Sequence, residues 1–378
     1  MASNRLCVAV IAAGLGCSPE QRAPSLGTST AELQSARQPT VTPQESGTTV
    51  RFFAVSPVDA RVVWASGNLG TFARTLDGGQ RWVSRVVPGA ETLQFRDVEG
   101  VSKDVAYLLA AGAGENSRIF KTGDGGDTWT EEIRNSDPNG FWDCFAFWTP
   151  RRGILMADSV NNRFPVHRTT DGQRWVDIGD RLPRAQDGEA AFAASGTCAA
   201  TQGGSNAWLA TGASAVARIL RTTDGGNTWR ASATPIQPQG TPTSGNVSVD
   251  FRDARRGIVG GGDVAAGGPQ LNVARSRDGG KKWSLTTPTP FEGAVFGITY
   301  TRNHREDDAD DGDDDDDGGD RALRRVVATG PGGAAWSPDE GGSWNLLAGI
   351  MNCWAVSFAT QRTGWLGCGA GRIFRIDF

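Results

Sequence analysis

The sequence predicts an all-β fold on three observations. The 378 residues include 51 Gly and 18 Pro, which favour many tight turns. The chain has 13 Trp but only 3 Met, a balance that favours strands over long helices. One turn motif also occurs six times, at intervals of 47 to 61 residues. Because a four-stranded blade has about this length, the repeats predict a β-propeller.

The repeated motif follows the pattern Ser/Thr-x-Asp-x-Gly-x-x-Trp. We expect its Asp to accept hydrogen bonds from the backbone of its own turn, its glycines to adopt positive φ, and its Trp to begin the next strand. The third copy lacks one glycine, so its turn should be tighter or distorted. The six Asp and Trp pairs are Asp77 with Trp82, Asp124 with Trp129, Asp171 with Trp175, Asp224 with Trp229, Asp278 with Trp283, and Asp339 with Trp344.

The segments between the motifs predict the remaining strands of each blade. Before the third copy, for example, FWDCFAFWT, ILMADS and FPVHRTT read as three strands. Three strands also follow the sixth copy, so a seventh blade needs one more. We expect residues 39–44 to supply that strand by pairing with the C-terminal strand, which leaves no open sheet edge. The prediction is a seven-bladed β-propeller of four-stranded antiparallel blades, closed by an N-terminal strand.

The N-terminal region predicts export. Residues 1–17 combine a basic residue, a short apolar stretch and small residues before Cys17, as a secretory signal peptide does. The GLGC sequence that ends at Cys17 resembles a bacterial lipobox, which implies that Cys17 is lipidated. The alternative is a signal peptide that is cut nearby without lipidation. We therefore expect an exported protein of the bacterial cell envelope, an outer-membrane lipoprotein facing the periplasm or the cell surface.

The rest of the chain divides into a tether and a folded body. Residues 18–47 are rich in Ser, Thr, Pro and Gln and lack apolar periodicity, so they predict a flexible tether. Residues 48–378 form the predicted propeller. The acidic segment 306–320 is an insertion within its sixth blade, and we interpret it as a solvated loop. Weak calcium binding is the alternative, although the segment lacks the EF-hand pattern.

Four cysteines lie outside the predicted signal peptide, and they allow three disulfide pairings. Cys353 and Cys368 lie on successive predicted strands, and export would permit a disulfide, so this pair is the first choice. Cys144 and Cys198 are the other two. Buried free thiols are the alternative, and none of the four has the spacing of metal ligands.

The motif resembles the Asp-box, or BNR-repeat, propeller superfamily over essentially the whole mature chain. The run GWLGCGAGRIF and the aromatic strand before it look like the photosystem II stability and assembly factor-like group. That resemblance implies an assembly or stability role for a partner complex. Sialidases and two-propeller xyloglucanases share the motif, but it lies at the blade periphery, away from their active sites. The six copies are therefore expected to be structural.

Catalytic candidates lie on the strands that line the central channel. Several predicted innermost strands begin with a polar residue, namely Arg51, Asp143, Glu189, Asn246 and Asn352. Asp143 and Glu189 come from adjacent blades, so they could form the acid/base pair of a glycosidase. The alternative is that both carboxylates are hydrated and balanced by arginines.

Known enzymes of the resembled superfamily fit the sequence poorly. Sialidases use an arginine triad, a Tyr nucleophile and an Arg-Ile-Pro motif. This chain has only Tyr107 and Tyr300, both within apolar strand patterns, and no such motif. Xyloglucanases need two propellers facing each other across a cleft.

Other polar residues are binding candidates. Asp158 and Asp263 follow second strands and precede irregular loops, where they could contact a ligand or cap their own loop. Arg51, Arg96 and Arg163 could form a basic face for an acidic partner or a terminal carboxylate.

Several function classes lack support in the sequence. The two histidines, His167 and His304, lie in different blades, so neither a His-based triad nor a zinc site is expected. No phosphate-binding loop is recognisable, no cofactor is implied, and the repeated Trp residues have core positions to fill rather than a nucleic-acid platform to form.

We therefore expect a non-enzymatic, monomeric scaffold, or an assembly or stability factor, that binds another envelope protein. The alternative is a carbohydrate-binding protein or glycoside hydrolase, with a glycan as its ligand.

Overall fold

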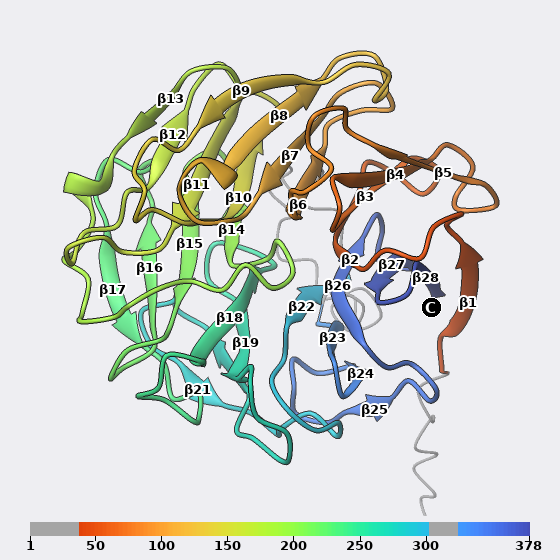
Figure 1. Ribbon diagram of the computed structural model, residues 1–378. Coiled ribbons are helices and arrows are strands. Elements are labelled where there is room, and N and C mark those ends of the chain that lie inside the picture. The colour runs from red at the N-terminus through yellow and green to blue at the C-terminus, as the bar shows by residue number, and fades with distance from the viewer. Residues whose placement is uncertain (1–37, 302–323) are drawn as a thin grey trace, which may run out of the picture. The chain divides into compact units, whose positions relative to one another are not determined.

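Seven four-stranded antiparallel sheets are arranged as blades around a central channel in the computed structural model, which describes residues 38–301 and 324–378 (Figure 1). The predicted seven-bladed β-propeller is confirmed. Besides strands, the described residues contain two short 3-10 turns, at Gly114–Asn116 and Gly179–Arg181. None of their helices is long and apolar enough to cross a membrane.

The strands of each blade follow one another from the channel outward. In blades 1 to 3 they are β2 (Phe52–Pro57), β3 (Val63–Gly67), β4 (Thr71–Thr75) and β5 (Trp82–Val86); β6 (Phe95–Gly100), β7 (Ala106–Ala110), β8 (Arg118–Thr122) and β9 (Thr130–Arg134); and β10 (Trp142–Thr149), β11 (Arg152–Ala157), β12 (His167–Thr169) and β13 (Trp175–Asp177).

In blades 4 to 7 they are β14 (Ala199–Gln202), β15 (Asn206–Thr211), β16 (Arg218–Thr222) and β17 (Arg230–Ala233); β18 (Ser244–Phe251), β19 (Gly257–Asp263), β20 (Val273–Ser276) and β21 (Ser284–Leu285); β22 (Gly297–Tyr300), β23 (Val326–Gly330), β24 (Gly333–Ser337) and β25 (Asn345–Leu346); and β26 (Cys353–Phe358), β27 (Thr363–Cys368), β28 (Arg372–Asp377) and β1 (Thr40–Glu45).

The ring is closed by β1, as expected. This strand pairs antiparallel with β28, from Thr40 opposite Asp377 to Glu45 opposite Arg372, and the two lie side by side in Figure 1. Gln44 connects the strand to blade 1, because its Oε1 accepts a hydrogen bond from Trp82 Nε1 (2.9 Å) and its Nε2 donates to the carbonyl of Gly78 (3.0 Å). Residues 40–45 belong to the propeller, although the sequence-based division placed them in the tether.

The turns that contain the repeated motif have the expected geometry. In the second copy, Thr122 Oγ1 accepts a hydrogen bond from the Gly126 amide and Asp124 Oδ1 accepts one from the Thr128 amide, both at 2.9 Å. Each bond reaches four residues along the chain. Gly125 and Gly126 have φ of 79° and 88°, a backbone conformation in which glycine carries no Cβ penalty.

The third copy is tighter by one residue, which confirms the expectation drawn from its missing glycine. Thr169 Oγ1 accepts a hydrogen bond from the Gly172 amide (2.9 Å), and Asp171 Oδ1 accepts one from the Arg174 amide (2.8 Å). Both bonds reach three residues along the chain rather than four. The hairpin therefore keeps the same donors and acceptors with one fewer residue in its turn.

The hydrophobic core is divided among the interfaces between blades. Each pair of neighbouring blades encloses its own apolar cluster, such as the one that joins Trp64 and Phe72 of blade 1 to Phe95 and Leu108 of blade 2. Burial of a side chain of this size contributes about 1.5–3 kcal/mol. Buried aromatic donors add polar links, as where Trp208 Nε1 donates to the Gly279 carbonyl of the next blade (3.0 Å).

Blade 4 departs from the sequence-based expectation. Its innermost strand is β14, so Glu189 does not begin a channel strand. Residues 190–197 instead form a crossing segment that spans the channel. Ser195 Oγ donates to the Phe296 carbonyl of blade 6 (2.5 Å), and Thr197 Oγ1 is hydrogen-bonded to Ser248 Oγ of blade 5 (2.6 Å). This path lets the segment contact blades 5 and 6.

Small residues allow the crossing segment to pass through the channel. Its sequence is AAFAASGT. A Cβ at Gly196 would lie 2.3 Å from Asp97 Oδ1 and 3.1 Å from Ala54 Cβ, and the residue has a φ of +71°. Any larger residue here would be strained by the positive φ and would force the Asp97 carboxyl group to move.

Both disulfides connect elements near the channel. Cys353 and Cys368 are bonded across β26 and β27, which confirms the expected pair. Cys144 on β10 is bonded to Cys198, which directly follows the crossing segment. The second bond therefore fixes one end of that segment to blade 3.

Some sequence-based expectations fall outside the described residues. These are the signal peptide, the lipidation of Cys17, most of the tether, His304 and the acidic insertion 306–320.

Candidate functional site

β-bulges at the start of the innermost strands build one mouth of the channel. In five of these strands the pairing register shifts just after the first residues, which leaves one extra residue on the inner strand. A bulge re-aims the side chain of its extra residue. The extra residues are Phe53, Arg96, Asp143, Val247 and Trp354.

Aromatic rings and two arginines form a connected row at this mouth. Trp354 makes edge-on contacts with Phe53 and Phe296, with ring centroids 5.4 and 4.8 Å apart. The Arg51 guanidinium lies over the Trp354 ring at 4.7 Å, and that of Arg96 lies over the Phe53 ring at 3.9 Å. Phe192 packs against the same apolar cluster as Trp354. We call these residues, together with Asp143 and Asp158, the channel mouth.

The channel mouth holds Arg96 in a fixed position. Its Nη2 and Nε donate to Gln94 Oε1 (2.6 and 3.1 Å), and its Nη1 donates to the Ala193 carbonyl on the crossing segment (3.0 Å). Burial and the nearby charge of Arg51 lower the pKa of Arg96 to about 10, although Asp143 opposes this. The guanidinium is therefore cationic at neutral pH and held in one position by protein acceptors.

Two carboxyl groups lie against each other beside Arg96. Asp143 is 1% exposed, and its side chain is hydrogen-bonded to that of Asp158. Burial, followed by the charge of Asp158, raises the pKa of Asp143 well above its ordinary value. Burial also raises the pKa of Asp158 to about 6, although hydrogen bonds from Ala191 and Asp143 oppose the shift. Both shifts favour a proton on the pair.

The structure thus brings together four of the residues that the sequence singled out: Arg51, Arg96, Asp143 and Asp158. The acid/base pairing suggested for Asp143 and Glu189 is replaced by two separate arrangements. Asp143 contacts Asp158, whereas Glu189 forms a buried ion pair with Arg218, whose Nε lies 2.8 Å from Glu189 Oε1. Thr211 Oγ1 also donates to Glu189 Oε1 (2.6 Å), so this carboxylate serves the interior of blade 4.

The remaining candidates have local structural roles. Arg163 forms ion pairs with Asp177 and Asp180 at 2.8 and 2.6 Å, on the outer part of blade 3, so it is not part of a basic face with Arg51 and Arg96. Asp263 Oδ1 accepts a hydrogen bond from the Ala265 amide (2.9 Å) and caps its own loop.

The two asparagines that were predicted to begin innermost strands also make local hydrogen bonds. The amide of Asn246 is buried between strands of blades 4 and 5, where it donates to the Thr211 carbonyl (3.1 Å). Asn352 directly precedes β26 and accepts a weak hydrogen bond from Trp354 Nε1 (3.4 Å).

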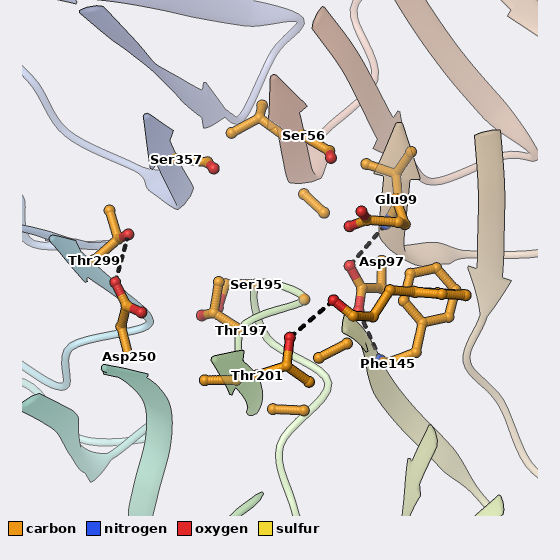
Figure 2. Close-up of a pocket in the computed structure, with 18 of the residues that line it drawn as sticks. Ser56, Asp97, Glu99, Phe145, Ser195, Thr197, Thr201, Asp250, Thr299 and Ser357 are labelled. Carbon is orange, nitrogen blue, oxygen red and sulfur yellow. Dashed lines mark hydrogen bonds between the residues drawn. The ribbon is translucent and has the colours of Figure 1, made fainter. Parts of the chain in front are cut away.

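A second chamber lies on the other side of the crossing segment. It is a cavity of about 440 Å³ lined by the later residues of the innermost strands, with Ser195, Gly196 and Thr197 in its lining. Figure 2 shows Asp97 and Glu99 on one wall and Asp250 and Thr299 on the opposite wall. We call this cavity the acidic chamber.

Two carboxyl groups of the acidic chamber accept hydrogen bonds from neighbouring strands. Asp97 accepts hydrogen bonds from the amides of Val98 and Phe145, both within 2.8 Å. Burial nevertheless raises the pKa of Asp97 well above its ordinary value, since these bonds only partly offset it. Asp250 Oδ2 accepts hydrogen bonds from Thr299 Oγ1 (2.9 Å) and the Tyr300 amide (2.7 Å). These groups therefore connect neighbouring innermost strands.

Sequence reasoning missed the aromatic part of the channel mouth and the whole acidic chamber. Phe53 and Trp354 look like ordinary strand residues, because the bulges that turn them toward the channel leave no sequence signal. Phe296, just before β22, gives no signal either. For the chamber, the acidic residues within the apolar strand patterns FRDVEG and SVDF offered a weak signal. Across residues 38–301 and 324–378, no group of three His, Cys, Asp or Glu side chains is placed to hold a metal ion.

Comparison with solved structures finds propellers of several kinds. YCF48 bound to a D1 peptide is 17% identical with a TM-score of 0.56, over 89% of this chain and 97% of that one. YCF48 from Cyanidioschyzon merolae is 15% identical with a TM-score of 0.60, over 89% and 98%. A GH74 enzyme from Niastella koreensis is 15% identical with a TM-score of 0.58, over 88% of this chain.

These likenesses show a shared β-propeller fold. The chain spans only 53% of the length of that GH74 enzyme. A virginiamycin B lyase from Staphylococcus aureus is also similar, at 13% identity and a TM-score of 0.61, over 90% of this chain and all of that one. The same fold therefore occurs in a peptide-bound protein and in enzymes, and function has to be argued from the site. No family model and no curated protein sequence matches this chain.

Proposed function

We propose that this chain is a non-enzymatic scaffold that binds a protein partner, and that the channel mouth receives a peptide segment carrying an anionic group, such as a terminal carboxylate. The observation that carries this proposal is the row of Arg51, Trp354, Phe53 and Arg96. Two guanidiniums supply planar hydrogen-bond donors that match a carboxylate, and the rings between them supply apolar contact for the adjoining residues.

The comparisons support the same direction. YCF48 is described bound to a D1 peptide, and the fold match covers 97% of that protein. The sequence resemblance to the photosystem II stability and assembly factor-like group agrees with a role in the assembly or stability of a partner complex. The partner proposed here is another protein of the cell envelope.

The proposal includes export and a membrane anchor at Cys17. Its support is the signal-like sequence of residues 1–17 and the presence of two disulfides, which persist in oxidising compartments. Metabolic labelling with palmitate tests the anchor. Label is expected on the full-length protein and not on the Cys17→Ala variant, and equal labelling of both proteins would contradict the anchor.

The carbohydrate alternative has weaker support. Its two carboxylates would need to lie about 5–10 Å apart with room for a sugar or water between them. Asp143 and Asp158 are in direct hydrogen-bonding contact instead, and Glu189 is occupied by Arg218. The fold match to the GH74 enzyme is the observation in favour, and a glycan hydrolysis panel with Asp143→Asn as control tests it.

Selection from a random peptide library tests the proposed function. The library is displayed with free C-termini, and each selected peptide is then synthesised with a free carboxylate and with a C-terminal amide. We expect the amide form to bind about tenfold or more weakly, because charge-assisted hydrogen bonds are lost. Equal binding of the two forms, or no selected peptide at all, would argue against carboxylate recognition at the mouth.

A further inference from the structure

The contact between Asp143 and Asp158 lies inside the channel mouth, directly beside its anion-binding groups. Asp143 is 1% exposed, and its Oδ2 meets no N–H or O–H donor among the described residues. Strand pairing places the two carboxyls side by side, since Trp142 is paired with Ala157 and the Asp158 amide donates to the Phe141 carbonyl. Two adjacent buried carboxylates repel each other, so the pair favours holding a proton.

Two arginines are the charged groups nearest to the pair. The charge of Arg96 on β6 lowers the pKa of Asp143, and the charge of Arg51, just before β2, lowers the pKa of Arg96. The crossing segment contributes backbone groups: the Ala191 amide donates to Asp158 Oδ1 (3.0 Å), and the Ala193 amide is hydrogen-bonded to Asp143. The charge on the pair thus acts directly on the guanidinium that the proposed function uses.

We propose that the protonation of the Asp143–Asp158 pair sets the affinity of the channel mouth for an anionic peptide group. This inference rests on the proposed function. With one proton, the pair carries a single negative charge that offsets part of the charge of Arg51 and Arg96. With a second proton, the pair is neutral and both guanidiniums attract the anion fully. The pair is a specificity-determining element, because it controls how strongly the mouth prefers an anion.

The direction of the pH dependence follows from this charge count. Burial raises the pKa of Asp158 to about 6, so the second proton binds as the pH falls through that value. An anion bound beside Arg96 favours the protonated pair, and binding therefore takes up a proton between about pH 5 and pH 7. If the bound anion raises the pKa of Asp158 by about one unit, affinity increases about fivefold across this range. A peptide carboxylate stays ionised throughout, since its pKa is about 3.5.

The test uses the strongest free-carboxylate peptide from the selection described above. Its affinity is measured by calorimetry from pH 5 to pH 7.5 at constant ionic strength, for the wild-type protein and for Asp143→Asn/Asp158→Asn. We expect the wild-type affinity to rise about fivefold toward low pH. The double variant has no carboxyl group left in the pair to ionise, so it should bind tightly at every pH.

A matched control comes from blade 5. Asp263 ends β19 and accepts a backbone hydrogen bond within its own loop, so it resembles Asp158 in position but lies outside the channel mouth. The Asp263→Asn protein should follow the wild-type pH profile. Loss of the profile in this control would show that the pH effect does not come from the pair, and would overturn the inference.

A second measurement keeps the inference testable if the double variant does not fold. Residue-assigned side-chain carboxyl NMR of the free wild-type protein should show Asp158 titrating near pH 6 and Asp143 staying protonated to higher pH. Titration of both Asp143 and Asp158 at their ordinary values would overturn the inference. A peptide that requires its carboxylate yet binds equally at all pH values would also overturn it while leaving the proposed function intact. Failure to select any peptide would instead contradict the proposed function itself.

Discussion

Removal of the Cys144–Cys198 disulfide should destabilise the propeller more than removal of the Cys353–Cys368 disulfide. The first bond joins residues 54 positions apart in the chain, and the second joins residues 15 positions apart. Both bonds are buried, so replacement of each pair by Ala removes a similar volume of side chain. The two double variants, Cys144→Ala/Cys198→Ala and Cys353→Ala/Cys368→Ala, therefore differ mainly in the length of loop released in the unfolded chain.

The expected difference can be calculated from these separations. The loop-entropy relation gives about 4 kcal/mol for the longer loop and about 3 kcal/mol for the shorter one. The longer bond also anchors the crossing segment, whose hydrogen bonds reach blades 2, 5 and 6. Its loss should weaken these contacts as well, so the true gap should exceed about 1 kcal/mol.

Urea unfolding of the oxidised proteins, followed by tryptophan fluorescence, measures this difference. If unfolding is irreversible, the unfolding rate replaces the free energy of unfolding. We expect the midpoint to fall in both variants and to fall further in Cys144→Ala/Cys198→Ala. An equal or smaller loss in that variant would refute the view that this disulfide holds the crossing segment in place.

Three further changes test the fold and the assignments of polar residues. In a protein that begins after residue 47, the free energy of unfolding should fall by several kcal/mol, because the hydrogen-bond ladder between β1 and β28 is lost. A synthetic peptide of residues 38–47 should restore part of its thermal stability. Glu189→Ala should cost about 3 kcal/mol or more in urea unfolding, because Arg218 is left buried and unpaired, whereas unchanged stability would revive a functional role for this carboxylate. The hydroxyl and amide of Thr128 lower the pKa of Asp124 to about 2, below its unfolded value of about 4. Asp124 therefore stabilises the fold above about pH 4 and loses this effect as the pH falls toward 2, so Asp124→Asn should reduce acid destabilisation in that window, and an unchanged acid profile would contradict this.

The repeats made the architecture predictable because each one encodes a local turn. The spacing of Asp77, Asp124 and the later copies predicted six blades, and the three strands after the sixth copy predicted the seventh. The missing glycine beside Asp171 predicted the tighter third turn. The closing strand was predictable because a blade without its fourth strand leaves an open edge. In each case the information lies in neighbouring residues or in the count of strands.

The functional site was predictable only in part. Arg51, Arg96, Asp143 and Asp158 could be chosen because polar residues at strand ends are conspicuous. Their partners could not be assigned, since Asp143 was expected to meet Glu189 and meets Asp158 instead. The difference arises at blade 4, where the crossing segment replaces the expected strand and Glu189 is drawn to Arg218. Contacts between residues far apart in the chain decide such pairings.

The affinity of a free-carboxylate peptide for arginine variants tests the central claim most directly. Arg51→Gln and Arg96→Gln remove the two charges of the channel mouth, and Arg163→Gln removes an exposed ion pair on the outer part of blade 3 as a matched control. We expect Kd to rise about tenfold or more in each mouth variant and to stay unchanged in the control. Equal affinity of all four proteins would contradict the claim that the mouth binds an anionic peptide group.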